Sequence, residues 1–280
     1  MHLATQTFSD RQFAALAHFV EREVGIRLPP TKRLMVEGRL RKRARALGLG
    51  TLDAYAEHVL DQGFEDGEVV HLVDCVTTNK TDFFREPAHF DFLCDTAVPA
   101  LVGRRGDRLL KVWSAASSIG AEAYTIAMLL QDMVAAGGRF RFSILGTDVS
   151  TEVIAEARAA IYPAALVEPV PPALRQRYLM ASSAPGDARV RVVPELRRLV
   201  QFHRLNLMEP AYPFDRDVDV ILCRNVLIYF DRATQAAVVA RLAGHLRPGG
   251  FLILGHSESM AGGGVPGLTP LLPTIFQREA

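Results

Sequence analysis

Three polar side chains follow a predicted strand directly and are candidates for ligand binding. Residues 218–223, VDVILC, are rich in branched apolar side chains, a composition typical of a buried strand in a parallel sheet. Arg224, Asn225 and Tyr229 come next in the chain. Ligands of open α/β sheets bind beyond the carboxyl ends of the strands, so these side chains fall where chemistry is expected. An ordinary strand with a solvated loop after it fits this segment equally well.

Two more predicted strand ends carry features suited to a nucleoside. The loop at residues 114–124, SAASSIGAEAY, has small side chains that permit close backbone approach. It lacks the G-x-G-x-x-G spacing of dinucleotide sites, and Glu122 in the following helical turn would repel a pyrophosphate. Asp148 ends the next predicted strand, where a carboxylate typically accepts ribose hydroxyls, although Asp148 is also suited to cap a helix. Together these residues favour S-adenosylmethionine, which has a ribose and positive charge but no phosphate.

A third candidate segment, VTTNKTDFFREPAHF at residues 76–90, combines hydrogen-bonding groups with aromatic rings. Asn79, Thr81 and Arg85 alternate with Phe83 and Phe84, a pattern that fits neither a helix nor a strand. Such a segment is typical of an ordered loop packed over a ligand. It is equally suited to connect two domains.

The elements that would position these residues fall into two groups. Residues 1–76 show only helical patterns, beginning with a capping box formed by Ser9 and Gln12. Further along the chain, predicted strands alternate with predicted helices, at residues 109–113, 121–133, 140–145 and 151–160. This alternation predicts a parallel sheet with right-handed crossovers.

The second half of the predicted sheet is interrupted. Residues 163–204 contain proline pairs and turns, and the sequence RVRV at residues 189–192 predicts a short antiparallel hairpin there. The alternation then resumes with a helix at residues 233–245 and a strand at residues 251–254. Residues 274–277 are expected to form an antiparallel edge strand.

Composition narrows the classes of function. The chain has 280 residues, 49% of them hydrophobic, and a net charge of +1, so no overall field favours nucleic acid. No secretory signal and no uninterrupted apolar run of membrane-spanning length is visible, which predicts a cytoplasmic protein without membrane insertion. The three cysteines form no close pair and the eight histidines show no paired ligand spacing, so no metal is expected.

Six segments together carry a resemblance to a known family: TTNKTDFFRE, WSAASSIGAEAYTIAM, GTDVS, LNL, CRNVLIYF and GHSES, in this order. Over nearly the whole chain the sequence resembles the chemotaxis receptor (CheR-type) protein-glutamate O-methyltransferases. The resemblance implies a Rossmann-like class I S-adenosylmethionine-dependent methyltransferase domain of the α/β class at residues 77–280, after an N-terminal all-helical domain at residues 1–76. It also implies a small antiparallel β insertion at about residues 163–204.

The resemblance further implies the activity. A methyl group would pass from S-adenosyl-L-methionine to glutamate side chains of chemoreceptors, the methyl-accepting chemotaxis proteins, giving methyl esters and S-adenosyl-L-homocysteine. The reference pKa of glutamate is about 4.3, so its carboxylate is already a nucleophile at neutral pH and no general base is needed. Orientation of the reactants would then supply the catalysis, up to about 7 to 11 kcal/mol.

Residue by residue, the resemblance implies two sets of site residues. Arg85 would orient the substrate carboxylate, and Tyr229 would shape the pocket for the transferred methyl group. The expected cofactor-binding residues are Asn79, Thr81, Arg85, Glu122, Asp148, Asn206, Leu207, Arg224 and Asn225. Lys80, Ile119 and Ala121 depart from the family pattern, and these departures bear on affinity more than on identity.

Substrate docking is expected on the second predicted helix, residues 31–46. It has a single acid, Glu37, and an excess of basic residues, among which the predicted docking residues are Lys32, Arg33, Arg39, Lys42 and Arg43. Such a run is usually a solvated face, but it also complements the glutamates of receptor methylation helices. The insertion at residues 163–204 is a possible binding place for a receptor C-terminal tether peptide.

Three other functions stay open. One is methylation of nucleic acid or a small molecule; amino-group methylation of bases commonly uses an N/D-P-P-Y strand end, which is here Arg224-Asn225-Val226-Leu227. The second is a CheR-like methyltransferase in a pathway other than chemotaxis. The third is a signalling module that binds S-adenosylmethionine without catalysis.

Overall fold

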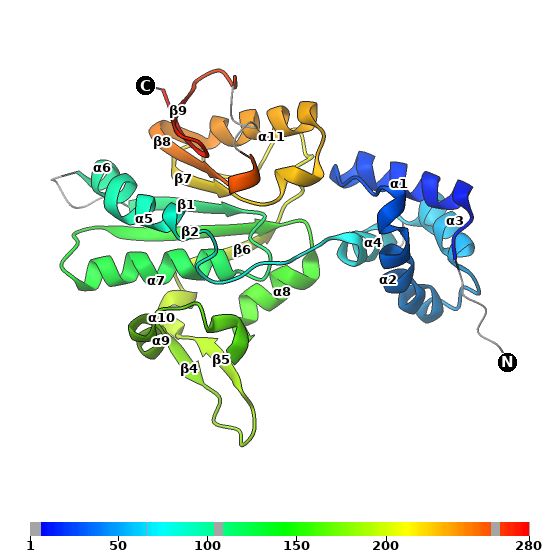
Figure 1. Cartoon of the computed structure of the whole chain (residues 1–280), viewed down its shortest axis with the longest axis horizontal. Coiled ribbons are helices and arrows are strands. Elements are labelled where there is room, and N and C mark those ends of the chain that lie inside the picture. The colour runs from blue at the N-terminus through cyan, green and yellow to red at the C-terminus, as the bar shows by residue number, and fades with distance from the viewer. Residues whose placement is uncertain (1–6, 66, 104–108, 259–263, 280) are drawn as a thin grey trace.

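The structure is a computed structural model that describes residues 7–65, 67–103, 109–258 and 264–279. A group of helices from the first part of the chain lies beside a sheet that helices cover (Figure 1). A segment without helix or strand runs from the helical group across to the sheet, and the last described strand of the chain belongs to that sheet.

The amino-terminal domain is helical, as predicted. Its helices are α1 (Asp10–Val24), α2 (Arg33–Ala46), α3 (Leu52–Gln62) and α4 (Glu68–Val76), with a 3-10 turn (Pro30–Lys32) before α2. Ser9 caps α1 by accepting a hydrogen bond from the Gln12 backbone at 3.3 Å, so the predicted capping position is confirmed. The reciprocal half of the predicted capping box was wrong, because the Ser9 backbone donates to Asp53 at 2.8 Å. Gly25 ends α1 at φ 74°, where a side chain would meet Met208 and Phe230 of the other domain.

The main sheet has seven strands in the order β6-β2-β1-β7-β8-β10-β9. Their bounds are β1 (Leu109–Ala115), β2 (Arg141–Asp148), β6 (Val200–Arg204), β7 (Val218–Cys223), β8 (Leu246–Leu254), β9 (Leu268–Leu272) and β10 (Ile275–Arg278). The first five strands in this order pair in parallel, and β10 is antiparallel to both of its neighbours. The antiparallel strand was predicted at residues 274–277, but its place at the edge was wrong, because β9 pairs outside it.

Apolar side chains fill both faces of this sheet. Val112 belongs to a core shared with α7 (Ala121–Ala135), whereas its neighbour Trp113 belongs to a core shared with α11 (Arg232–His245). The six residues of β7 are all buried, which confirms the central strand predicted from its composition. α8 (Thr151–Ala159) follows β2, and α5 (Ala88–Phe92) and α6 (Val98–Val102) precede β1.

A second, three-stranded sheet interrupts the alternation. It consists of β3 (Ile161–Pro163), β4 (Leu179–Ala181) and β5 (Arg189–Val192), in the antiparallel order β3-β5-β4. The hairpin predicted around residues 189–192 is therefore confirmed. The small sheet is shorter than the expected insertion at 163–204, because Val200–Arg204 pairs with β2 in the main sheet. Short helices α9 (Pro172–Tyr178) and α10 (Pro194–Arg197) complete this region.

Polar contacts connect the helical domain to the sheet domain. The Asp74 carboxylate near the end of α4 accepts hydrogen bonds from the backbone and hydroxyl of Thr151, at 2.8 and 2.7 Å. The Asn206 amide donates to the Glu23 carbonyl at 2.6 Å. These bonds fix the helices beside the carboxyl ends of β2 and β6.

Candidate active site

A cleft between the two domains contains all the residues predicted to bind the cofactor or to act in catalysis. Its empty space, counted together with the open solvent at its entrance, is about 1020 Å³. It lies beyond the carboxyl ends of β1, β2 and β7, as expected for an open α/β sheet. The predicted residues that line it are Asn79, Thr81, Arg85, Glu122, Asp148, Asn206, Leu207, Arg224, Asn225 and Tyr229.

The strand ends bring their backbone close to this cleft. Ala116, Ser118 and Asn225 line it with φ values of 60°, 50° and 59°, in the left-handed region that costs a non-glycine residue energy. Gly120 precedes α7 at φ 85°, and a Cβ there would lie 2.8 Å from the Phe202 ring. The small residues after β1 are therefore required by close packing as well as by backbone conformation.

Asp148 lines the cleft at the end of β2. Its carboxylate accepts hydrogen bonds from the backbones of Ser118, at 2.9 Å, and Ser150, at 3.0 Å. Burial raises the pKa of Asp148, while the hydrogen bonds act in the opposite direction. The cap of α8 is Ser150, whose hydroxyl accepts from Val153, so the alternative role of Asp148 as the helix cap is not what the structure shows.

Glu122 occupies the first turn of α7 and faces Arg224 across the cleft. Its carboxylate accepts a hydrogen bond from the Ser114 hydroxyl at 2.7 Å and pairs with Arg224 Nη1 at 2.9 Å. The Arg224 guanidinium also lies over the Phe90 ring, 5.3 Å from its centroid, and donates to the Arg85 carbonyl. Arg224 thus ties β7, α7 and the segment after α4 together.

Glu86 is a site residue that the sequence reasoning missed. It accepts hydrogen bonds from Arg224 at 3.2 Å and from the Asn225 amide at 3.1 Å. Burial alone would raise the pKa of Glu86, but Asn225 and the charge of Arg224 outweigh burial and lower it. The motif TTNKTDFFRE ends at this residue, but Asn225 lies 139 residues further along the chain, so no local spacing indicated the contact.

Glu258 is a second missed residue, and it orders the loop after β7. Its carboxylate accepts hydrogen bonds from the backbones of Asn225 and Gly255, each at 2.8 Å, and from Ile228 at 3.3 Å. Burial raises the pKa of Glu258 against these hydrogen bonds. The motif GHSES contains it, whereas Ser259 at the end of that motif lies outside the described residues.

The segment between α4 and α5 covers the cleft, as the sequence predicted for an ordered loop. The Asn79 carbonyl accepts a hydrogen bond from the Ser118 hydroxyl at 2.9 Å, which fixes the segment to the loop after β1. Arg85 Nη1 donates to the Lys80 carbonyl at 3.2 Å, and among the described residues Arg85 forms no ion pair with a carboxylate. Its guanidinium therefore keeps capacity to bind an acidic ligand.

Tyr229 and Lys32 meet at the cleft from different domains. Tyr229 belongs to a 3-10 turn (Leu227–Tyr229), and the Lys32 ammonium lies 5.0 Å from the centroid of its ring. Both residues line the cleft. Lys32, predicted only for docking, is thus placed beside the residues of the reaction site, which the charge pattern alone did not indicate.

The other predicted docking residues differ in their surroundings. Arg43 pairs with the buried Glu68 at 2.6 Å, and Arg33 pairs with the buried Glu37 at 3.0 Å. Arg39 is exposed but donates to the Thr77 carbonyl at 2.7 Å. Lys42 is exposed as well. Arg33 and Arg43 therefore hold the helical domain together, while Arg39 and Lys42 present charge to solvent.

The chemistry of the cleft fits S-adenosylmethionine. Asp148 offers carboxylate oxygens suited to ribose hydroxyls, and Glu122 brings negative charge near the end of β1. The Ser117 hydroxyl, which also lines the cleft, is buried and makes no hydrogen bond within the part of the chain that the structure describes. These groups at the carboxyl ends of a mostly parallel sheet are those expected of an S-adenosylmethionine-dependent methyltransferase.

Comparison with known proteins identifies the family within that class. The sequence model described as "CheR methyltransferase, SAM binding domain" matches residues 79–267, and that described as "CheR methyltransferase, all-alpha domain" matches residues 11–77. The chain belongs to the CheR methyltransferase family. The resemblance found in the six motifs is thereby confirmed, and so are the cofactor and the fold.

Curated relatives cover most of the chain. Chemotaxis protein methyltransferase 2 of Pseudomonas aeruginosa is 39% identical over 254 residues, which are 90% of this chain and 88% of that protein. The chemotaxis protein methyltransferase of Escherichia coli is also 39% identical over 254 residues, 90% of this chain and 86% of that protein. The one from Borreliella burgdorferi is 33% identical over 272 residues, 96% and 94% of the two chains. Among the described residues, no helix is long and apolar enough to span a membrane.

Proposed function

We propose that this methyltransferase esterifies glutamate side chains of chemoreceptors in chemotaxis adaptation. S-Adenosyl-L-methionine would supply an electrophilic methyl group on a sulfonium, and S-adenosyl-L-homocysteine would leave. The substrate carboxylate forms the new C–O bond with its own electron pair while the S–C bond breaks, so no proton has to be moved. The absence of a general base from the proposed residues is consistent with this reaction.

The observation that carries the proposal is the position of Arg85 at the same cleft as Glu122 and Asp148. Its guanidinium lines the cleft and has no carboxylate partner among the described residues. A guanidinium can hold a carboxylate through two hydrogen bonds, which would orient one oxygen for in-line attack. Lys32, 5.0 Å from the Tyr229 ring, adds positive charge on the side from which a carboxylate would enter.

The remaining roles are proposed from the same geometry. Asp148 would bind the ribose, Glu122 the methionine moiety, and Asn206 with Leu207 would flank the adenine. Asn79, Thr81, Arg224 and Asn225 would close the cofactor site, and Tyr229 would shape the space around the methyl group. The Asn206 amide already donates to Glu23, so its contribution to adenine binding would come from packing and backbone.

Two partners follow from the proposal. The cytoplasmic methylation helices of a receptor would dock through the exposed charges of α2, Arg39 and Lys42, with Lys32 nearest the reaction site. A receptor C-terminal tether would pair with an edge of the small sheet, where β3 and β4 are the outer strands. Both partners and the site of action at the inner side of the membrane are consistent with a cytoplasmic protein.

The experiment that tests this function is transfer of a tritiated methyl group to membranes that contain chemoreceptors. A base-labile methyl ester on the receptor is expected, and receptors whose methylation-site glutamates are replaced by alanine are the control. Label on nucleic acid or on a small molecule would instead support methylation of that other class of substrate. Binding of the cofactor without transfer to any substrate would contradict catalysis and favour a signalling module.

A further inference from the structure

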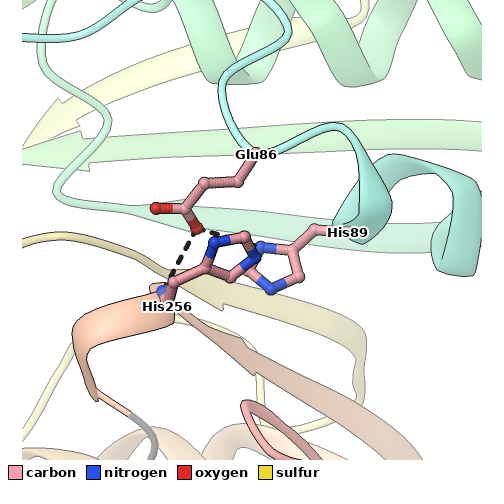
Figure 2. A group of neighbouring side chains, drawn as sticks. All are labelled: Glu86, His89 and His256. Carbon is pink, nitrogen blue, oxygen red and sulfur yellow. Dashed lines mark hydrogen bonds and ion pairs between the residues drawn. The ribbon is translucent and has the colours of Figure 1, made fainter.

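Two segments that are far apart in the sequence bring three side chains together beside Arg224. Glu86, His89 and His256 point toward one another from the segment before α5, from α5 itself and from the turn after β8 (Figure 2). One ligand atom from each residue lies within 4.8 Å of those from the other two. We propose that this triad binds a divalent transition-metal ion of the Zn²⁺ type.

A buried nitrogen of His89 without a hydrogen-bond partner is a second observation that points to a bound ion. Its side chain is 3% exposed, and its Nδ1 makes no hydrogen bond within the described residues although it lies 3.3 Å from Glu86 Oε2. Nε2 lies 2.9 Å from the Thr274 hydroxyl. If Nε2 carries the proton and donates to Thr274, the lone pair of Nδ1 faces a carboxylate oxygen, and a cation bound by both atoms removes this repulsion.

The distance between these two atoms fits such a cation. Zinc binds histidine nitrogen and carboxylate oxygen at about 2.0 to 2.2 Å in a tetrahedron, which separates two ligand atoms by about 3.3 to 3.5 Å. The observed 3.3 Å between Nδ1 and Oε2 lies in this range.

His256 completes a donor set of two histidines and one carboxylate. Its ring contacts His89 edge-on, with the centroids 4.9 Å apart, and it is exposed to solvent. A His₂Glu set leaves a fourth position open to water, as in many zinc enzymes. Hydrogen bonds to the ligands themselves orient them: His89 bonds to Thr274, and Glu86 accepts from the Asn225 amide. Such outer hydrogen bonds are typical of metal sites.

The charges around the triad leave room for a bound cation. Arg224 shares Glu86 Oε2 at 3.2 Å, and its positive charge opposes a metal ion. Glu122, 2.9 Å from the other side of the same guanidinium, offsets that charge.

A metal ion bound by the triad would change how two segments beside the cofactor cleft are held. Glu86 is next to Arg85 in sequence and bonds to Arg224 and Asn225, whereas His256 begins the turn after β8. A metal ion would join these two segments and compete with Arg224 for Glu86 Oε2. Binding would therefore tighten the wall of the cofactor cleft without entering it.

The test is a titration of the tag-free, chelator-treated full chain with Zn²⁺ in competition with a chromophoric chelator. About one equivalent is expected to bind. His256→Ala should weaken this binding at least about tenfold, since even an outer hydrogen bond to a metal ligand is worth about 10- to 100-fold. His256 is exposed, and its backbone bond to Glu86 is kept in the variant, so the fold should be preserved.

Two matched variants complete the test. His18→Ala removes an exposed histidine of α1 and should bind Zn²⁺ as the wild type does. Thr274→Val removes the hydroxyl at His89 Nε2 while keeping the shape of the side chain, and should weaken binding about tenfold. Equal Zn²⁺ affinity in the wild type and His256→Ala, or no binding by the wild type, would overturn the proposal. Neither result depends on methyl transfer, so it would leave the proposed function untouched.

Discussion

Arg224 and Glu122 form an ion pair at 2.9 Å that connects the residue after β7 to the first turn of α7. The Arg224 side chain is 3% exposed and that of Glu122 is 13% exposed, so little water screens the pair. Arg224 also bonds to Glu86 and to the Arg85 carbonyl. One buried guanidinium thus sets the positions of two acids and of the segment that carries Arg85.

Arg224→Ala should lower both stability and cofactor affinity. The substitution leaves Glu86 and Glu122 buried without their cation, and breaking a buried pair in this way costs about 3–5 kcal/mol. Urea unfolding and calorimetric titration with S-adenosylmethionine would measure the two effects. Glu122→Gln should partly rescue the stability of Arg224→Ala, since it removes one uncompensated charge. Equal loss in the single and double variants would contradict a direct coupling of the two residues.

Much of the fold could be predicted because its signals are local. The apolar run of β7 indicated a buried strand, and Ser9 indicated the start of α1, so both were placed by composition and capping alone. β9 was missed because its burial pattern shows one buried residue followed by four exposed ones, without the alternation of a half-buried strand. Its pairing with β10 is a tertiary contact that no local pattern encodes.

Part of the candidate site could also be predicted from local signals in the sequence. Residues at strand ends, such as Asp148 and Arg224, follow from the position of each strand. Glu86 and Glu258 act through partners far along the chain, and their roles depend on which loops meet. The sequence also could not predict that Arg39 is exposed while Arg43 forms an ion pair, because the buried partner Glu68 lies in another helix.

Arg85→Ala should lower methyl transfer at least about tenfold at saturating cofactor, while the fold is kept. The guanidinium is proposed to orient the substrate carboxylate, and a single lost orienting contact to a charged group is worth about 1.5–3 kcal/mol. Initial rates with receptor-containing membranes would measure the loss. Arg85→Lys keeps the charge but not the two-point geometry and should restore only part of the rate. Unchanged transfer by Arg85→Ala would refute this role.

Tyr229 should act through shape more than through its hydroxyl. Tyr229→Phe keeps the ring beside Lys32 and should retain most of the rate, whereas Tyr229→Ala opens the space around the methyl group and should lower kcat. The same membrane assay, at saturating receptor and cofactor, measures kcat without a contribution from KM. A Phe variant as inactive as the Ala variant would instead assign the function to the hydroxyl.

Acid should destabilise the protein through His89. The folded-state pKa of His89, about 4, lies below the ordinary histidine value of 6.5, because burial and Arg224 disfavour the imidazolium. As the pH falls below 6.5 the unfolded chain takes up this proton before the folded chain does, so stability is lost between about pH 6.5 and 4. At about 1.4 kcal/mol per pKa unit, the free energy of unfolding falls by about 3.5 kcal/mol at most.

Urea unfolding at pH 7 and pH 4.5, in the presence of a chelator, measures this effect. His89→Gln lacks the titrating group, so its stability should fall less than that of the wild type over the same range. His18→Gln, which changes an exposed histidine, should keep the wild-type dependence. If the pH dependence of His89→Gln matches the wild type, the neutral buried imidazole is not its source.

Charge reversal at two positions of α2 should distinguish a residue that docks the receptor from one that stabilises the helical domain. Lys42 is exposed, so Lys42→Glu should raise the apparent KM for the receptor with little change in stability or cofactor affinity. Arg43 pairs with Glu68, which is 2% exposed and also accepts a hydrogen bond from Tyr55 at 2.8 Å. Arg43→Glu would place two acids together in the helical domain and should lower its stability by about 3–5 kcal/mol.

The two variants carry the same change of charge and differ in what surrounds it, so each is the control for the other. Kinetics against receptor membranes at low and high salt should show a salt-dependent KM effect for Lys42→Glu, because exposed charges are screened. Thermal unfolding should identify Arg43→Glu by its lowered midpoint. Unaltered kinetics of Lys42→Glu at low salt would remove this position from the docking surface, since the charge that steers an acidic partner would then have to lie elsewhere on the protein.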